Sequence, residues 1–420
     1  MKKLLFSLVL LAPICGKTQT LDECRQLARE HYPEIARFGL IEQAANFSLA
    51  NASRAWLPQG SVNGQITWQN SVMELPEQFL QMMQAQGVNY PGLKPLQYKV
   101  GVDLNQQIWD GGLTAANRAK IKATSEVERR QTDVNLYDVD SRVQDIYFGL
   151  LLLDEHIKSA QLTATLLDST LRQVDALVAN GVAMKSDRQQ IAAQRLTLEQ
   201  QIEKLAASRN AYSKVLSIFI GRELGEISRP TATYKPISEQ STERLFESRL
   251  SAVEASRKST NTSVMPKIGA FVSAYMGYPG LNYFESMMST KMMPNLIAGI
   301  QLKWNFSALY TRKNTLKNLD VQKKEIETAR EIFNFNRTIA SEQQQADIEA
   351  MKRVIAHDDE ILQLRCEVLD AARAQLQNGT LDTTALLSKI TDAELAATER
   401  ETHSLELLQA QYKLYQTENR

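Results

Sequence analysis

Residues 139–178 read VDSRVQDIYFGLLLLDEHIKSAQLTATLLDSTLRQVDALV. They place apolar side chains at alternating steps of four and three positions through nearly six heptads. These positions are Val139, Val143, Ile146, Leu150, Leu153, Ile157, Ala160, Ala164, Leu167, Leu171, Val174 and Val178. This spacing brings them to one face of an α-helix and is typical of a coiled-coil seam. The stretch therefore predicts a long helix that packs lengthwise against other helices.

Prolines and Asn-Gly pairs define the ends of the long helices. No proline lies between Pro95 and Pro230 or after Pro294. Each of these stretches contains one Asn-Gly pair, at 180–181 and at 378–379, which is a turn signal. We therefore predict two helical hairpins, over residues 113–221 and 308–420. A helix over 113–180 would be ~100 Å long, which indicates a coiled coil, a tube wall or a filament.

The two halves of the chain resemble each other at one constant offset. Gly101, Leu104, Ile108, Ala176, Val178, Asn180 and Gly181 have counterparts 198 residues later at Gly299, Leu302, Phe306, Ala374, Leu376, Asn378 and Gly379. Such a constant offset predicts a tandem duplicated unit. We place a first repeat at 21–221, a linker at 222–240, where Gly and Pro gather, and a second repeat at 241–420.

The N-terminus has the plan of a secretory signal peptide, which we place at residues 1–20. Lys2 and Lys3 precede an apolar run from 4 to 14. That run is much shorter than the roughly 20 residues of a spanning helix. Cys15 leaves lipidation open, although the bulky Pro13 and Ile14 before it fit a lipoprotein signal poorly.

Each repeat contains two segments of strictly alternating polarity ahead of its hairpin. We predict strands at about 60–70 and 98–109 in the first repeat, and at about 266–278 and 295–306 in the second. In the first of these, Val62, Ile66 and Trp68 alternate with Asn63 and Gln65. Segments of about ten residues with one apolar face match the wall of a transmembrane β-barrel, although an amphipathic sheet on a soluble core gives the same pattern.

Four strands cannot close a barrel, and hydrocarbon does not tolerate an open sheet edge. A barrel of this kind must therefore be shared between chains, with eight, twelve or sixteen strands. The expected fold is mixed and mainly α: a tandem duplicated unit of two transmembrane strands and a long coiled-coil hairpin, assembling into a shared β-barrel and an α-helical tunnel.

The composition argues against several other classes of protein. The 48 basic and 48 acidic residues balance, so nucleic acid is not an expected partner. No CxxC motif, catalytic triad order, phosphate loop or dinucleotide fingerprint is visible. We expect no enzyme, no cofactor and no metal site. The acidic run at 357–360, His-Asp-Asp-Glu, is interpreted as a solvated helix face, and the seven methionines of the strand-joining loops as apolar packing.

The whole mature chain resembles the TolC-type outer-membrane efflux proteins. The resemblance rests on the segment LAREHYPEI at 27–35, on Leu57-Pro58 and Met265-Pro266 before the first strand of each repeat, and on IWDGG at 108–112. Gly181 and Gly379 open the hairpin tips, with Ser186-Asp187 and Thr384 at the family's spacing. The second repeat lacks the Asp-Gly-Gly, and Ala385 stands where the family places an acidic residue.

The resemblance implies a homotrimer with a twelve-stranded barrel in outer-membrane lipid and a twelve-helix tunnel in the periplasm. Such a duct conducts substrates passively from an inner-membrane pump through a periplasmic adaptor protein. Its narrow point would lie at the hairpin tips. The candidate tip and gate residues are Gly181, Lys185, Ser186, Asp187, Arg188, Gly379, Asp382 and Thr384.

Two alternatives remain open at this point. A secreted or surface coiled-coil structural protein would explain the heptads and the signal peptide. A periplasmic adaptor would explain one hairpin, although this chain has two. For the tip, we expect an ion pair of Asp187 between hairpins, and the alternative is a purely local charge at the start of a helix.

Overall fold

The computed structural model describes residues 18–88, 90–231, 240–378 and 380–419. Most of the predicted signal peptide, including Cys15, most of the predicted linker, and Gly379 lie outside the described residues. The chain divides into two compact units, which we describe separately. The hairpin unit comprises residues up to 39, 129–246 and 328–420, and the sheet unit comprises 40–128 and 247–327.

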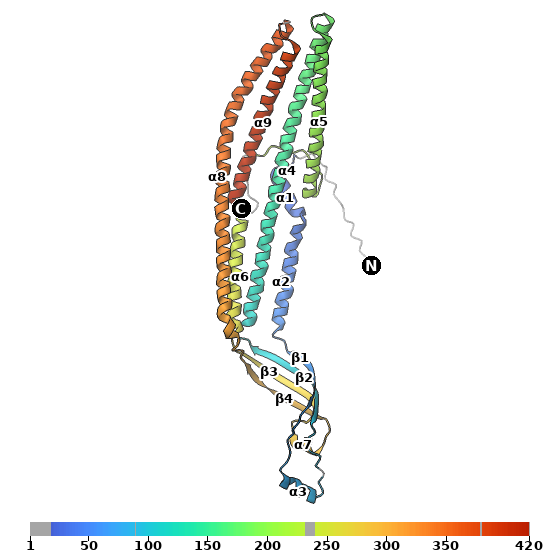
Figure 1. The fold of residues 1–420 in the computed structure, drawn as a ribbon, viewed down its shortest axis with the longest axis vertical. Coiled ribbons are helices and arrows are strands. Elements are labelled where there is room, and N and C mark those ends of the chain that lie inside the picture. The colour runs from blue at the N-terminus through green and yellow to red at the C-terminus, as the bar shows by residue number, and fades with distance from the viewer. Residues whose placement is uncertain (1–17, 89, 232–239, 379, 420) are drawn as a thin grey trace, which may run out of the picture. The chain divides into compact units, whose positions relative to one another are not determined.

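The elements follow one another in the predicted order (Figure 1). They are α1 (Leu21–His31), η1 (Pro33–Ile35), α2 (Ala36–Arg54), β1 (Gln59–Trp68), α3 (Glu77–Ala85), β2 (Leu96–Trp109), α4 (Leu113–Ala179), α5 (Lys185–Ile220), α6 (Ser241–Ser263), β3 (Lys267–Tyr278), α7 (Tyr283–Met288), β4 (Met293–Lys303), α8 (Ala308–Gln377) and α9 (Thr383–Asn419). The predicted fold, mainly helical with a small antiparallel sheet, is confirmed. Descent from a duplicated unit stays a prediction.

The hairpin unit contains the two long hairpins, α4–α5 and α8–α9, with α1 packed against them. Seven of the twelve predicted seam positions of α4 are buried. Near the tips, one apolar cluster takes residues from all four arms, including Leu167, Ile191, Leu369 and Ile390. The heptad seam of α4 therefore packs in a core that both hairpins share.

Helix α1 docks on α4 through a buried charge cluster. Thr20 and Glu23 form a capping box at its start. Further along α1, Arg29 donates two hydrogen bonds to the buried carboxylate of Asp140, Nε–Oδ1 at 2.8 Å and Nη2–Oδ2 at 2.6 Å. The buried Arg25 lies 3.7 Å from the same carboxylate. The carboxylate is thus compensated by two cations, as burial requires.

The sheet unit holds one antiparallel sheet in the order β1-β2-β3-β4. Val62 pairs with Val102, Val102 with Ala274, and Ala274 with Leu296. Residues directly opposite in antiparallel strands point to the same face. The even-numbered apolar residues of all four segments therefore meet on one face of the sheet.

A compact corner turns β2 into α4. The buried Asp110 accepts hydrogen bonds from the N–H groups of Gly112 at 2.9 Å and Thr114 at 2.6 Å. Gly111 and Gly112 have φ values of +69° and +85°, a region that glycine adopts without steric cost. A Cβ at Gly111 would also collide with Met265 at 2.4 Å. These constraints explain the Asp-Gly-Gly motif.

Within the described part of the chain, none of the helices combines the length and the apolar character that crossing a membrane requires.

Candidate functional site

One face of the sheet exposes a continuous apolar surface. Its largest contributors are Val62, Ile66, Leu296, Ile300 and Leu302, each at least 67% exposed. Soluble monomers rarely leave so many large apolar side chains open to water on one face. This surface, which we call the apolar face, needs a cover of lipid or protein.

The opposite face of the sheet is polar and internally hydrogen-bonded. Asn63 on β1 donates to Asp103 on β2. Gln301 on β4 reaches Asn105 on β2 at 3.2 Å, passing over Gly269 of β3. This polar face suits contact with water, so the two faces of one thin sheet prefer different media.

The sheet ends in open edges. Among the described strands, β1 pairs with β2 alone and β4 with β3 alone, so each outer strand has a row of backbone groups without a strand partner. Such edges pair readily with further strands. An apolar face, a polar face and two open edges are what a segment of a shared barrel presents.

The tip of the first hairpin follows Gly181, whose φ is +73°. Lys185, Ser186, Asp187 and Arg188 form the first turn of α5. The carboxylate of Asp187 accepts the Met184 N–H at 3.0 Å, and Arg188 pairs with Asp175 of α4 at 2.6 Å. Within the described chain the partners of Asp187 are thus local, and its ion pair between hairpins stays a prediction.

The tip of the second hairpin is held differently. Asp382 accepts the Ala385 N–H at 2.6 Å and so caps α9. Thr384 donates to the side-chain carbonyl of Gln190 on α5 at 3.1 Å. The sequence did not single out Gln190, because its role depends on how the two hairpins align. The structure thus brings Thr384 next to the first tip, whereas Gly379 lies outside the described residues.

Three ion pairs join the arms of the first hairpin, and the sequence analysis did not predict them. Arg188, Arg195 and Arg209 lie along α5. They pair with Asp175, Asp168 and Asp154 of α4, at 2.6, 3.0 and 2.5 Å. Each pair lies equally far from the turn on both arms. This mirror spacing of Arg and Asp about Gly181 is a signal that could have revealed them.

The interpretation of residues 357–360 as a solvated face was wrong for Asp358, which is buried, whereas Asp359 is exposed. Asp358 is buried, and its Oδ2 lies within hydrogen-bond distance of His403 Nδ1 of α9, at 2.8 Å. Asp359 pairs with Arg400 at 2.8 Å. Both carboxylates therefore join α8 to α9, because the helix face that carries them turns toward the return arm.

Polar contacts between the two hairpins add to the apolar core that they share. Ser159 of α4 and Thr398 of α9 share a hydrogen bond of 2.6 Å, and Gln409 of α9 donates to Asp145 of α4. Burial raises the pKa of the Glu394 carboxyl, and a hydrogen bond with Thr163 partly opposes this shift. Polar contacts of this kind keep α4 and α9 in register, and each hydrogen bond adds a modest stabilisation.

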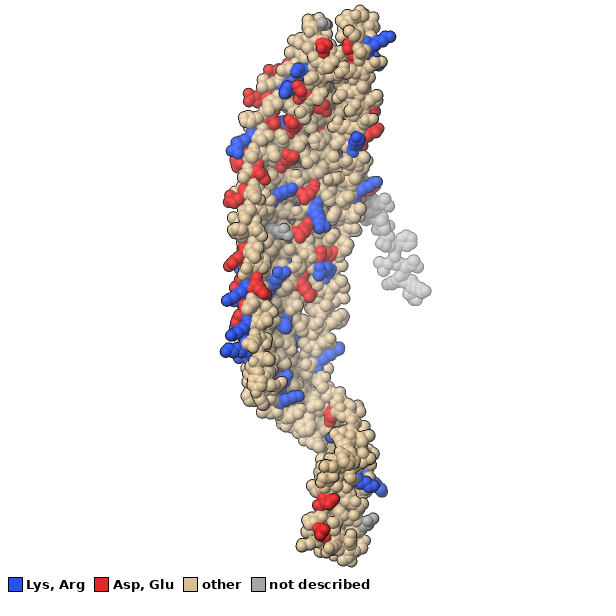
Figure 2. Space-filling view, in the orientation of Figure 1, with Lys and Arg blue, Asp and Glu red and all other residues tan. Residues whose placement is uncertain are grey.

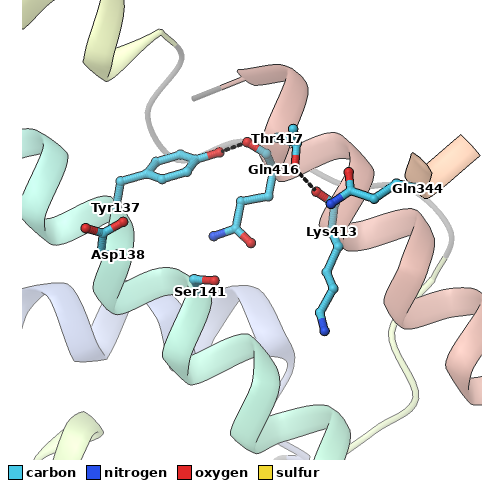
Figure 3. Close-up of a pocket in the computed structure, with 7 residues that line it drawn as sticks. All are labelled: Tyr137, Asp138, Ser141, Gln344, Lys413, Gln416 and Thr417. Carbon is cyan, nitrogen blue, oxygen red and sulfur yellow. Dashed lines mark hydrogen bonds between the residues drawn. The ribbon is translucent and has the colours of Figure 1, made fainter. Parts of the chain in front are cut away.

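A polar cavity of about 200 Å³ lies among α4, α8 and α9 (Figure 3). Its lining residues are Tyr137, Asp138, Ser141, Gln344, Lys413, Gln416 and Thr417. Tyr137 Oη donates to the Gln416 carbonyl at 2.5 Å, so the cavity wall joins α4 to α9. A volume of this size suits several water molecules, and the lining contains no nucleophile paired with a base.

The described thiols and the loop methionines differ in their burial. In the described residues, no group of three or more His, Cys, Asp or Glu is arranged to hold a metal ion. Cys24 and Cys366 are free thiols, one buried and one exposed. Met287 packs with Leu93 and Tyr278 in an apolar cluster of the strand-joining loops, whereas Met73 and Met82 are exposed.

Comparison with solved structures fixes the architecture. No protein-family model matches the sequence, and no curated protein does. The chain aligns with the outer-membrane channel OprN over 95% of its own length and 89% of that chain, with a TM-score of 0.68 and 15% identity. It has the fold of the TolC-type outer-membrane channels.

Other structures of this fold match almost as fully. VceC, an outer membrane protein of Vibrio cholerae, gives a TM-score of 0.65 at 11% identity, with 95% of this chain and 94% of that one aligned. The open state of the MtrE outer membrane channel of Neisseria gonorrhoeae gives 0.65 at 15% identity, with 95% and 88% aligned. The TolC-type fold expected from the sequence resemblance is thereby confirmed.

Proposed function

We propose that this protein is an outer-membrane exit duct of a tripartite efflux or secretion system. The observation that carries the proposal is the four-stranded sheet with one exposed apolar face, one polar face and two open edges. Copies joined edge to edge would place every apolar face in lipid and enclose every polar face around water. Three copies supply the twelve strands implied by the resemblance.

The hairpins would then form a tunnel wall in the periplasm. A coiled-coil structural protein would account for the hairpins but not for the four amphipathic strands. Passive conduction is part of the proposal, because the resemblance implies a duct that an inner-membrane pump drives. A periplasmic adaptor and an inner-membrane pump are the partners proposed for the hairpin tips.

Paired cysteine substitutions on β4 test the placement of the sheet. Ile300→Cys lies on the apolar face and Gln301→Cys, its neighbour, on the polar face. Both are made in a Cys366→Ser background, because Cys366 is the exposed native thiol of the described chain. In lipid vesicles, a water-soluble thiol reagent should label position 301 and leave position 300 protected.

If the sheet were soluble, the reagent would label positions 300 and 301 equally. Equal labelling of the two positions in vesicles would therefore contradict the proposal. Extraction gives an independent comparison with the coiled-coil structural protein. A tether should leave membranes with salt or alkali, whereas a duct should need detergent.

A further inference from the structure

A cluster of positive charge surrounds the end of the sheet where the strands meet the helices. Its members are Arg118, Lys120, Lys122, Lys258, Lys313 and Lys317, which we call the basic collar. All six side chains are exposed, and none has a carboxylate partner among the described residues. In the segments 110–122, 257–266 and 304–317 that hold the collar, Asp110 is the one acidic residue, and it is buried. Figure 2 shows blue side chains on these helix ends with few red ones among them.

The collar belongs to one built end of the sheet unit. Ser259 of α6 donates to Asn117 of α4 at 2.7 Å, and Arg312 of α8 donates to Asn261 of α6 at 2.8 Å. These contacts hold the starts of α4 and α8 beside the end of α6. Lys122 and Lys317 lie nine residues into their helices, or roughly 14 Å. The whole collar thus lies within about three helical turns of the strand ends.

Exposed aromatic residues mark the same level. Trp109 ends β2, Trp304 follows β4, and Trp56 lies just before β1. All three indole rings are at least 41% exposed, and Trp304 Nε1 donates to the Val264 carbonyl at 3.0 Å. Aromatic rings with basic residues just beyond them, next to an apolar band, are typical of a membrane–water interface.

The other end of the sheet has a different charge. The loops there carry Glu74, Glu77 and Glu285 against Lys94 and Lys291. The chain as a whole is neutral, so the concentration of positive charge at the helix end is a local feature. The two ends of the sheet thus differ in their balance of charge, with an excess of basic residues at the helix end.

We propose that the basic collar binds the headgroups of anionic phospholipids in the membrane leaflet next to the helices. The inference rests on the proposed membrane placement of the sheet and adds a lipid preference to it. Headgroups extend several ångströms beyond the hydrocarbon, and the Debye length at physiological ionic strength is about 8 Å. Long lysine side chains cover the remaining distance by extending toward the phosphates.

Tryptophan fluorescence gives a direct test, because three of the four tryptophans lie at the collar and the fourth, Trp68, lies at the other end of β1. The full chain carrying Trp68→Phe is reconstituted into phosphatidylcholine vesicles with a minority of phosphatidylglycerol. Either lipid is brominated in turn, since bromine quenches nearby indoles. Per molecule of lipid, brominated phosphatidylglycerol should quench more strongly.

A collar variant, Lys120→Gln/Lys313→Gln/Lys317→Gln, is compared with a matched control, Lys204→Gln/Lys214→Gln/Lys324→Gln. The control lysines lie on α5 and further along α8. Each collar lysine near the surface should contribute about a fivefold preference at low salt. The collar variant should therefore lose most of the preference, and the control should keep it.

The other outcomes separate the two proposals. Equal quenching by both brominated lipids in the unsubstituted collar would overturn the lipid preference and leave the membrane placement intact. No quenching by either lipid would overturn both. An unchanged lipid preference in the collar variant, with altered ion selectivity in planar bilayers, would show that the lysines face the conduit instead.

Discussion

The two hairpins have similar lengths but are held together differently. In the first, three Arg–Asp pairs join the arms from the tip to the base, beginning with Arg188 and Asp175 beside the turn. In the second, the pair closest to the tip is Arg365 with Asp392, well below the turn. Its tip instead contacts the first hairpin, through Thr384 and Gln190. An ion pair therefore joins the two arms beside the first tip, whereas the second tip makes a polar contact with the first hairpin.

Burial follows the same division. On α9, Leu386 and Ile390 are buried against the first hairpin, whereas Ile361, Leu364 and Val368 of α8 stay exposed. These three residues form a row of exposed apolar side chains on α8. Association with further copies of the chain would reduce their exposure. Helix α8 thus contributes one face to the shared core, through residues such as Leu369 and Leu376, and leaves another face exposed.

The largest expected loss of stability is that of a substitution in the shared core, compared with one on the exposed face of α8. Ile390→Ala should lower the free energy of unfolding by about 2–5 kcal/mol, because it leaves a cavity in the shared core. Leu364→Ala should cost about 0.5 kcal/mol or less if its face stays open. Thermal unfolding in detergent measures both. A cost at Leu364 close to that at Ile390 would show that copies of the chain cover α8.

The native thiols report on the two hairpins without added probes. Cys24 packs with Leu216 and Ile220 of the first hairpin, and burial raises its pKa from 9.0 to about 11. A native-state thiol reagent at pH 8 should modify Cys366 on the second hairpin and leave Cys24 intact. After denaturation without reductant, both should react, whereas a count of zero would reveal a disulfide and contradict the topology.

The same raised pKa predicts a pH dependence. Because the unfolded chain ionises Cys24 first, stability should be complete below about pH 9 and fall between about pH 9 and 11, by at most about 3 kcal/mol. Denaturant titrations across this range give the slope. Cys24→Ala should flatten that slope, and a slope that persists unchanged in this variant would assign it to other groups.

Asp187 and Asp382 allow a comparison of the tips themselves, since each carboxylate caps a return arm. Replacing either by Ala should cost about 0.5–2 kcal/mol. If the tips form the gate, Asp187→Ala should also raise the leak current in planar bilayers. A similar leak in Asp382→Ala would indicate general loosening of the caps, and unchanged conductance with an intact oligomer would assign Asp187 a purely local role.

The smallest effect concerns the exposed pairs between arms. Arg195→Gln removes the partner of Asp168 and should cost about 0.2–1 kcal/mol, less at high salt. Arg400→Gln is the matched change in the second hairpin, where Asp359 is the partner. Salt-dependent unfolding compares the two, and a salt-independent loss would point to packing of the arginine stems.

Local periodicity made much of this architecture predictable. Helix α4 ends within one residue of the expected turn, because heptads and a proline-free run act along the chain. The alternation of apolar and polar residues in the strands likewise predicted the two faces of the sheet. The contact of Thr384 with Gln190 and the docking of Arg29 on Asp140 could not be predicted, because each depends on the alignment of segments far apart in sequence. The short helices α3 and α7 lie in loops whose composition signals no period.

The open edges of β1 and β4 have a consequence for biogenesis. A single chain in water would expose two unpaired strands beside a broad apolar surface, which is a template for misdirected aggregation. If copies of the chain join at these edges, as proposed, folding of the sheet and association of the chains would be coupled, and the apparent stability would rise with protein concentration.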